Sequence, residues 1–239
     1  MKIKNFSILC IAGFFSALSL HAQTAADGII SGYFDAIGGH DKIGQINSVY
    51  IEGTMNVMGN SSVNKVTVLN GKGYKSEMEF NGQPIVQTIT DKGGWMINPF
   101  MGSPDAVALP AEQYAAAKDE IFVAGPLYDY MNNGHLVKFA GMENAGNNPA
   151  YKVELTSPDS VKTTFYIDSA THFIDEKIIE TSGQSTTIMY SNYKKTDFGT
   201  LMAYTQDITI PQGMQLHYEV TKVEINKPVD VSVFDMPKK

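Results

Sequence analysis

The histidines are the side chains best suited to metal binding or acid–base catalysis, and they are dispersed along the chain. Long stretches of sequence separate His40, His135, His172 and His217. A zinc site or a general base needs such groups at fixed spacings or brought together by folding. No pattern in the sequence predicts that they converge. We therefore expect no metal site and no cofactor.

Motifs for nucleophilic catalysis and phosphate binding are also missing. The chain has no Gly-x-Ser-x-Gly motif, and the Ser-x-x-Lys segment Ser62–Lys65 falls in a strand-like context. The glycines mark turns, and no glycine-rich loop joins a strand to a helix, as a phosphate cradle requires. Asp159, Asp168 and Asp175 lie at expected strand ends or turns, where solvation explains them. The sequence predicts no catalytic residues and a protein without enzymatic activity.

The N-terminus predicts export. Met1–Lys4 is short and basic, Ser7–Leu20 is uncharged and apolar, and Ala22 is a small residue at the end of this stretch. This pattern is typical of a secretory signal peptide cleaved after Ala22. The stretch is too short to span a membrane, and no later segment approaches the ~20 apolar residues required. We expect a signal peptide at 1–22 and a periplasmic or secreted mature chain at 23–239.

Cysteine and arginine usage narrows the possible partners. Cys10, the only cysteine, lies within the apolar part of the signal peptide, so we expect neither lipidation nor disulfides or thiolate sites in the mature chain. The formal net charge is −7, and every basic residue is lysine. An acidic chain without guanidinium groups is poorly suited to nucleic acid. We expect no nucleic-acid partner.

Aromatic and methionine side chains concentrate around one segment in the middle of the chain. Flexible thioethers and aromatic rings suit a surface that accepts varied apolar ligands. The alternative is that these side chains simply pack helices onto a sheet. As candidate lining of an apolar cavity we name Trp95, Ile97, Phe100, Met101, Tyr114, Ile121, Leu127, Tyr130 and Met131.

Hydrophobic periodicity predicts a helix, then a long β region with one helical interruption. Residues 27–37 have apolar side chains at helical spacing, with Asp27 as a cap. A period of two follows, with Asn81-Gly82 as a hairpin turn. Between 103 and 133 the pattern is helical in two pieces, the first starting at Pro110 and the second near Pro126. The alternation then resumes and continues to about residue 225. These features predict a mainly β protein with a large antiparallel sheet of about eleven strands.

Three segments resemble the periplasmic outer-membrane lipoprotein-sorting family, the LolA/LolB-like proteins. The first, residues 89–100, is a turn followed by a strand that contains Trp95 and ends at Asn98-Pro99. The second is a strand at 164–168 with an aromatic-Ile-Asp sequence, together with the strands that follow it to Tyr193. The third is the Phe-x-x-Pro sequence at 234–237. The resemblance implies one domain over 23–239, an unclosed antiparallel β-barrel with a helical lid and an N-terminal helix. Carriers of this family hold the lid with an arginine, which this chain lacks.

The resemblance also implies a function. It indicates a carrier or chaperone that holds lipids, lipidated proteins or other apolar ligands between the concave sheet and the lid. Two other classes remain open. One is a protein-interaction or sensing module that uses the same fold to bind envelope proteins, and the other is a hydrolase acting on envelope components.

Overall fold

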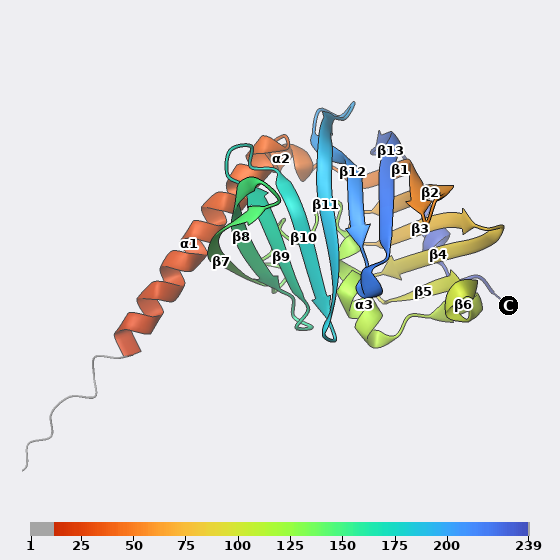
Figure 1. Ribbon diagram of the computed structural model, residues 1–239, viewed down its shortest axis with the longest axis horizontal. Helices are drawn as coiled ribbons and strands as arrows, with labels where there is room; N and C mark the ends of the chain where they lie inside the picture. Colours follow the sequence, from red (N-terminus) through yellow and green to blue (C-terminus); the bar gives the residue numbers. More distant parts are fainter. Residues whose placement is uncertain (1–11, 239) are drawn as a thin grey trace, which may run out of the picture.

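The computed structural model describes the backbone of residues 12–238 and the side chains of residues 24–211 and 213–238. Residues 1–11 of the predicted signal peptide lie outside it. Thirteen strands form one curved, open sheet (Figure 1). They are β1 (Ser48–Val57), β2 (Asn60–Leu69), β3 (Gly73–Phe80), β4 (Gln83–Thr90), β5 (Gly93–Asn98), β6 (Ser103–Ala108), β7 (Leu136–Ala145), β8 (Asn148–Thr156), β9 (Lys162–Asp168), β10 (Ile174–Thr181), β11 (Gln184–Lys195), β12 (Leu201–Thr209) and β13 (Gln215–Ile225).

The strand order is β6-β5-β4-β3-β2-β1-β13-β12-β11-β10-β9-β8-β7. Each pair is antiparallel, and nearly every strand lies beside its neighbour in sequence, as short turns require. The exceptions are β6 and β7, which are consecutive in sequence but form the two opposite edges. The two halves of the sheet are joined by β1 and β13, which pair from Val49↔Ile225 to Val57↔Leu216. The sheet ends at β6 and β7 and does not close, which confirms the predicted unclosed barrel.

The C-terminal part of α1 (Ala12–Ala36), α2 (His40–Ile43), α3 (Ala111–Ala117) and the 3-10 turn η2 (Lys118–Ile121) lie on the concave side of the sheet. The other 3-10 turns are η1 (Pro99–Met101) between β5 and β6, η3 (Pro211–Gly213) between β12 and β13, and η4 (Val231–Phe234), which packs on the opposite face against Gly73. We call residues 111–134 the lid. Within the described part of the chain, no helix is long and apolar enough to cross a membrane.

Two clusters of buried side chains fix the helices to the sheet. The larger one packs α1 on β7 to β10, with Phe34 2% exposed and Val153 and Ile167 fully buried. The smaller one packs the lid on the other half, where Ile121 contacts Ile89 and Leu109. Because the clusters occupy opposite ends of the concave face, the middle of that face lies between them.

The structure corrects four details of the sequence prediction. Residues 12–238 contain thirteen strands rather than about eleven. Ser103–Ala108, expected to be helical, is the edge strand β6. Residues 122–134 form turns rather than a second helix, because Gly125 (φ 70°) and Asp129 (φ 53°) adopt left-handed backbone conformations that interrupt a helix. The helix predicted to start at Asp27 also begins earlier, at Ala12.

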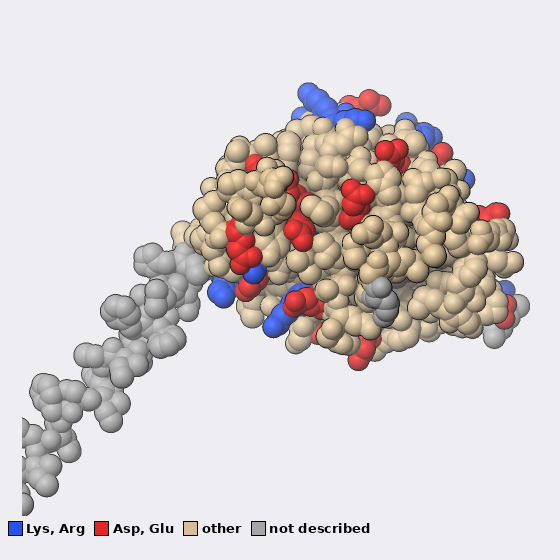
Figure 2. Space-filling model, in the orientation of Figure 1, with Lys and Arg blue, Asp and Glu red and all other residues tan. Residues whose placement is uncertain are grey.

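Charged side chains are spread over the outer surface. In the view of Figure 2, acidic groups lie across the middle of the face and lysines lie mainly near its rims. Several are paired along the strands, such as Lys152 with Glu143 (3.0 Å) and Lys222 with Glu224 (3.1 Å). Exposed pairs of this kind contribute little to stability, about 0–1 kcal/mol each.

Candidate functional site

A cavity of about 440 Å³ lies on the concave face between the two buried clusters. Its floor is formed by side chains from β1 to β3 and from β9 to β13 that alternate toward this face. The lid segment 122–127 and Tyr33 and Ile37 of α1 complete it. The volume falls within the roughly 300–1,000 Å³ of small-molecule binding sites.

Most of the lining is aliphatic or aromatic. Val49, Ile51, Val66 and Val68 line one side, and the register pairs Val49 with Val68 and Ile51 with Val66 directly across β1 and β2. On the other side of the cavity lie aliphatic and aromatic residues of β9, β10 and β12, among them Phe165, Ile174, Leu201 and Ile208. Such a surface binds hydrocarbon without a hydrogen-bonding penalty.

One ion pair, between Lys177 and Glu120, interrupts the apolar lining of the cavity. Lys177 of β10 lies on the concave face, and its Nζ is 3.6 Å from Oε1 of Glu120 in the lid. Burial alone would lower the pKa of the Lys177 ammonium, but Tyr190 and Glu120 raise it above its ordinary value. The ammonium therefore remains charged at neutral pH.

Tyrosines supply most of the other polar atoms. Burial raises the pKa of Tyr33, Tyr74 and Tyr190 above the ordinary phenol value, so their hydroxyls stay protonated. The hydroxyl of Tyr193 donates to the carbonyl oxygen of Ile174 at 2.8 Å. Protonated phenols are hydrogen-bond donors, so these rings offer both apolar surface and donors to the cavity.

Tyr218 of β13 differs from these tyrosines because its hydroxyl is buried and has no hydrogen-bond partner among the described residues. The residue is 5% exposed, and burial raises its pKa to about 12. Its ring lies against the backbone of Gly53, where an added Cβ would be 2.5 Å from the ring. Glycine at position 53 thus makes room for this phenol at the cavity floor.

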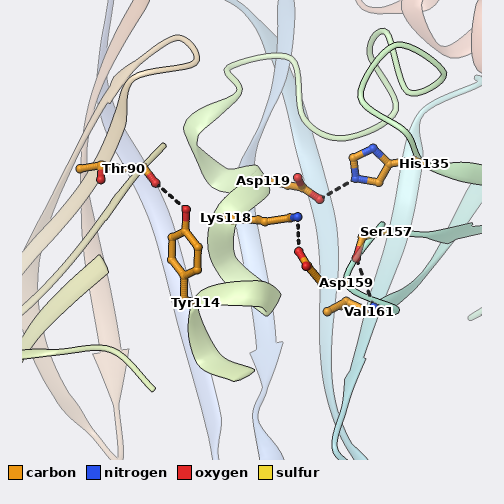
Figure 3. A network of polar contacts seen from close by, with 8 residues as sticks. All are labelled: Thr90, Tyr114, Lys118, Asp119, His135, Ser157, Asp159 and Val161. Atoms are coloured by element: carbon orange, nitrogen blue, oxygen red, sulfur yellow. Dashed lines mark hydrogen bonds and ion pairs between the residues drawn. The ribbon is translucent and has the colours of Figure 1, made fainter. Parts of the chain in front are cut away.

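Polar contacts hold the lid to both halves of the sheet (Figure 3). The hydroxyl of Tyr114 donates to the carbonyl oxygen of Thr90 at 3.0 Å on one side. On the other side, Asp119 Oδ2 lies 2.9 Å from His135 Nε2, and Lys118 pairs with Asp159. The lid is therefore fixed across the concave face rather than attached at one end.

Of the nine residues predicted to line a cavity, Leu127 lies in the wall of this one. Three others serve lid packing: Ile121 is buried against the sheet, Tyr114 bonds to Thr90, and the hydroxyl of Tyr130 donates to Asp27 of α1. Met131, predicted to lie beside Leu127 and Tyr130, is instead 66% exposed, because the segment is not helical.

Trp95 and Ile97 lie on the opposite face of the sheet. Trp95 lies opposite Thr88 in the ladder, and Thr88 lies opposite Lys75, so the three side chains share one face of the sheet. Lys75 is next to the cavity residue Tyr74 in sequence, and neighbouring residues of a strand point to opposite faces. The Trp95 indole is 6% exposed, and its Nε1 donates to the carbonyl oxygen of Phe234 at 2.9 Å. Phe100 and Met101 in η1 are 55% and 63% exposed at the sheet edge.

Sequence reasoning missed the polar residues of the site. Lys177, Tyr190 and Tyr218 come from three strands, and only the strand register brings them to one face. A usable signal was present for Lys177, because it shares its face with Ile179 in an alternating strand. A charged residue at an inward position is uncommon unless it is paired or binds a ligand.

The position of Trp95 gives a spectroscopic prediction. Its emission should be blue-shifted in the folded protein and unchanged by a ligand that fills the cavity, because the indole is buried on the other face. Phe234→Ala should shift the emission to the red, since the Phe234 ring covers this region of β3 to β5. Fluorescence spectra of both proteins, with and without an apolar ligand, check this. A strong response of Trp95 to the ligand would contradict it.

The open antiparallel sheet, with the lid across its concave face, forms a half-barrel that has an apolar cavity between sheet and lid. Compared by sequence, the chain matches no family model and no curated protein. Compared by structure, it is similar to a DUF1329 family protein from Desulfovibrio piger, with 13% identity and a TM-score of 0.58 over 88% of this chain and 97% of the other.

Two further solved structures have the same architecture. One is a putative outer membrane lipoprotein-sorting protein domain from Vibrio parahaemolyticus, with 13% identity and a TM-score of 0.56 over 87% of this chain and 95% of the other. The other is a LolA superfamily protein from Nitrosomonas europaea, with 14% identity and a TM-score of 0.59 over 90% and 97%. The chain therefore has the LolA/LolB-like fold that its sequence motifs predicted.

Proposed function

We propose that the protein is a non-enzymatic carrier of lipids, lipidated proteins or other apolar molecules in the periplasm. The observation that carries this proposal is the apolar cavity of about 440 Å³ between the concave sheet and the lid. The similarity in fold to a putative outer membrane lipoprotein-sorting domain supports it. The predicted signal peptide supports the compartment.

The energetics suit reversible carriage. Burying a hydrocarbon chain is worth about 0.8 kcal/mol per methylene group. Losses of translational, rotational and conformational freedom oppose this by an estimated 4–15 kcal/mol. The free energy gained by burial and the free energy lost by ordering are of similar size for a hydrocarbon chain as long as those of common membrane lipids. Affinity is then high enough to hold a ligand and low enough to release it.

The proposal predicts that the purified protein carries or takes up a lipid. Native mass spectrometry of protein from a bacterial periplasm should show an added apolar mass, and delipidated protein should regain mass when mixed with long-chain lipids. A protein that binds none of a set of fatty acids, alcohols and phospholipids would contradict the proposal. It would favour an interaction module built on the same fold.

A further inference from the structure

We propose that the cavity recognises the head group of its ligand, and that the ligand is a single-chain amphiphile with an anionic oxygen head group. This inference rests on the proposed carrier function and specifies the class of ligand. The head group would bind between Lys177 of β10 and the polar side chains of the neighbouring strands β11 to β13, and the hydrocarbon chain would lie along the aliphatic lining.

The first argument is the state of Lys177. Its side chain is 15% exposed, whereas that of its partner Glu120 is 43% exposed. The 3.6 Å separation is longer than the roughly 2.7–2.9 Å of a charge-assisted hydrogen bond. An ammonium has three donors, and Tyr190 is its other neighbouring partner. Glu120 lies near solvent and Lys177 does not. A ligand carboxylate or phosphate could therefore take the place of Glu120 at the ammonium.

The second argument is independent of Lys177. The Tyr218 hydroxyl is buried at the cavity lining and has no partner among the described residues. An unsatisfied buried hydroxyl costs free energy, about 1–3 kcal/mol, which a ligand oxygen would recover. Tyr218 lies opposite Gln206, and Gln206 lies opposite Tyr190, so the register sets three donor side chains in one row across β13, β12 and β11.

The row and Lys177 together favour an acidic oxygen group over a neutral or cationic one. Tyrosine hydroxyls, an amide and an ammonium all donate hydrogen bonds, and anionic oxygens accept them most strongly. The cavity is at the small end of the usual range for binding sites, which favours one chain over several. A fatty acid and a single-chain phosphate lipid share this chemistry.

A series with one chain length and three head groups tests the inference. Binding of hexadecanoate, hexadecyl phosphate and hexadecanol to the delipidated protein is measured by calorimetry or dye displacement. We expect at least one of the two anions to bind roughly 10- to 100-fold more tightly than the alcohol, as a hydrogen bond to a charged group provides. Which anion binds better identifies the source of the head group.

Matched variants locate the recognition. Lys177→Met should lower the affinity for the preferred anion to that for hexadecanol and leave the alcohol unaffected. Lys75→Met is the control, because Lys75 is similarly exposed at 19%, is paired with Glu77, and lies on the opposite face.

Glu120→Gln should increase anion affinity by removing the competing carboxylate. Tyr218→Phe removes one oxygen atom and should also weaken anion binding. This variant tests the inference independently if Lys177→Met fails to fold.

The outcomes separate the two proposals. Equal binding of all three ligands by the unmodified protein would overturn head-group recognition and leave the carrier function standing. Equal effects of Lys177→Met and Lys75→Met would overturn it as well. Failure of all three ligands to bind while a diacyl phospholipid binds would overturn this inference and leave the carrier function standing, and failure of the phospholipid as well would overturn both.

Discussion

Replacing Leu127 with aspartate is expected to abolish the binding of an apolar dye while most of the β-sheet signal remains. Leu127 is 3% exposed and lies in the cavity wall, at the lid. A carboxylate in this dry position costs several kcal/mol unless it is protonated or paired. The corresponding loss of affinity is roughly 100-fold or more. Dye fluorescence titrations and far-ultraviolet circular dichroism measure the two quantities separately.

Met131→Asp provides the control for this experiment. Met131 lies in the same lid segment but is 66% exposed, so the added carboxylate remains in water. Dye binding should therefore stay close to that of the unmodified protein. Retained binding in Leu127→Asp would show that the lid does not line the ligand site. Complete unfolding of that variant would show instead that the segment is required for the core.

Phe34→Ala is expected to lower the free energy of unfolding by about 3–5 kcal/mol, as for other buried phenylalanines. Phe34 is 2% exposed at the centre of the larger buried cluster. Its ring makes edge contacts with His40 and Tyr128 at centroid distances of 5.7 and 5.4 Å. Alanine would leave a cavity where α1 and the lid meet. Chemical denaturation curves measure the loss.

Phe100→Ala is the matched substitution outside the core. The Phe100 side chain is 55% exposed and contacts Phe80 at 5.5 Å between ring centroids. An exposed aromatic pair is worth no more than about 1.5 kcal/mol. Equal losses of stability in the two variants would mean that α1 is not held to the sheet by the Phe34 cluster.

The strand pattern could be predicted where local chemistry decides the structure. Alternation on both sides of Asn81-Gly82 predicted the hairpin of β3 and β4, and the observed φ values of 51° and 73° are those of a tight turn of this kind. The edge strand β6 was not predicted because the whole segment 103–133 has a pattern that indicates helix, and β6 also contains Pro104. Proline is tolerated there because β6 forms the border of the sheet.

The candidate site was predictable only in its general nature. Aromatic density indicated the lid, and Leu127 does line the cavity. The polar residues could not be found in the same way, because Lys177 and Tyr218 are brought to one face by the registers of three successive strand pairings, from β10 to β13. Trp95 was assigned to the lid side, but a one-residue change in strand position reverses the face to which a side chain points.

The pairing of β1 with β13 divides the chain into two lengths that could exist as separate polypeptides. Residues 48–108 and 136–225 each form a series of hairpins between consecutive strands, and the ladder from Val49↔Ile225 to Val57↔Leu216 joins them. A cut at an exposed turn of the lid, such as Asn132, would interrupt none of these ladders. The two fragments would then assemble through one strand pairing and the lid contacts. Because that pairing closes the longest loop in the described sheet, we expect it to limit the folding rate of the intact chain.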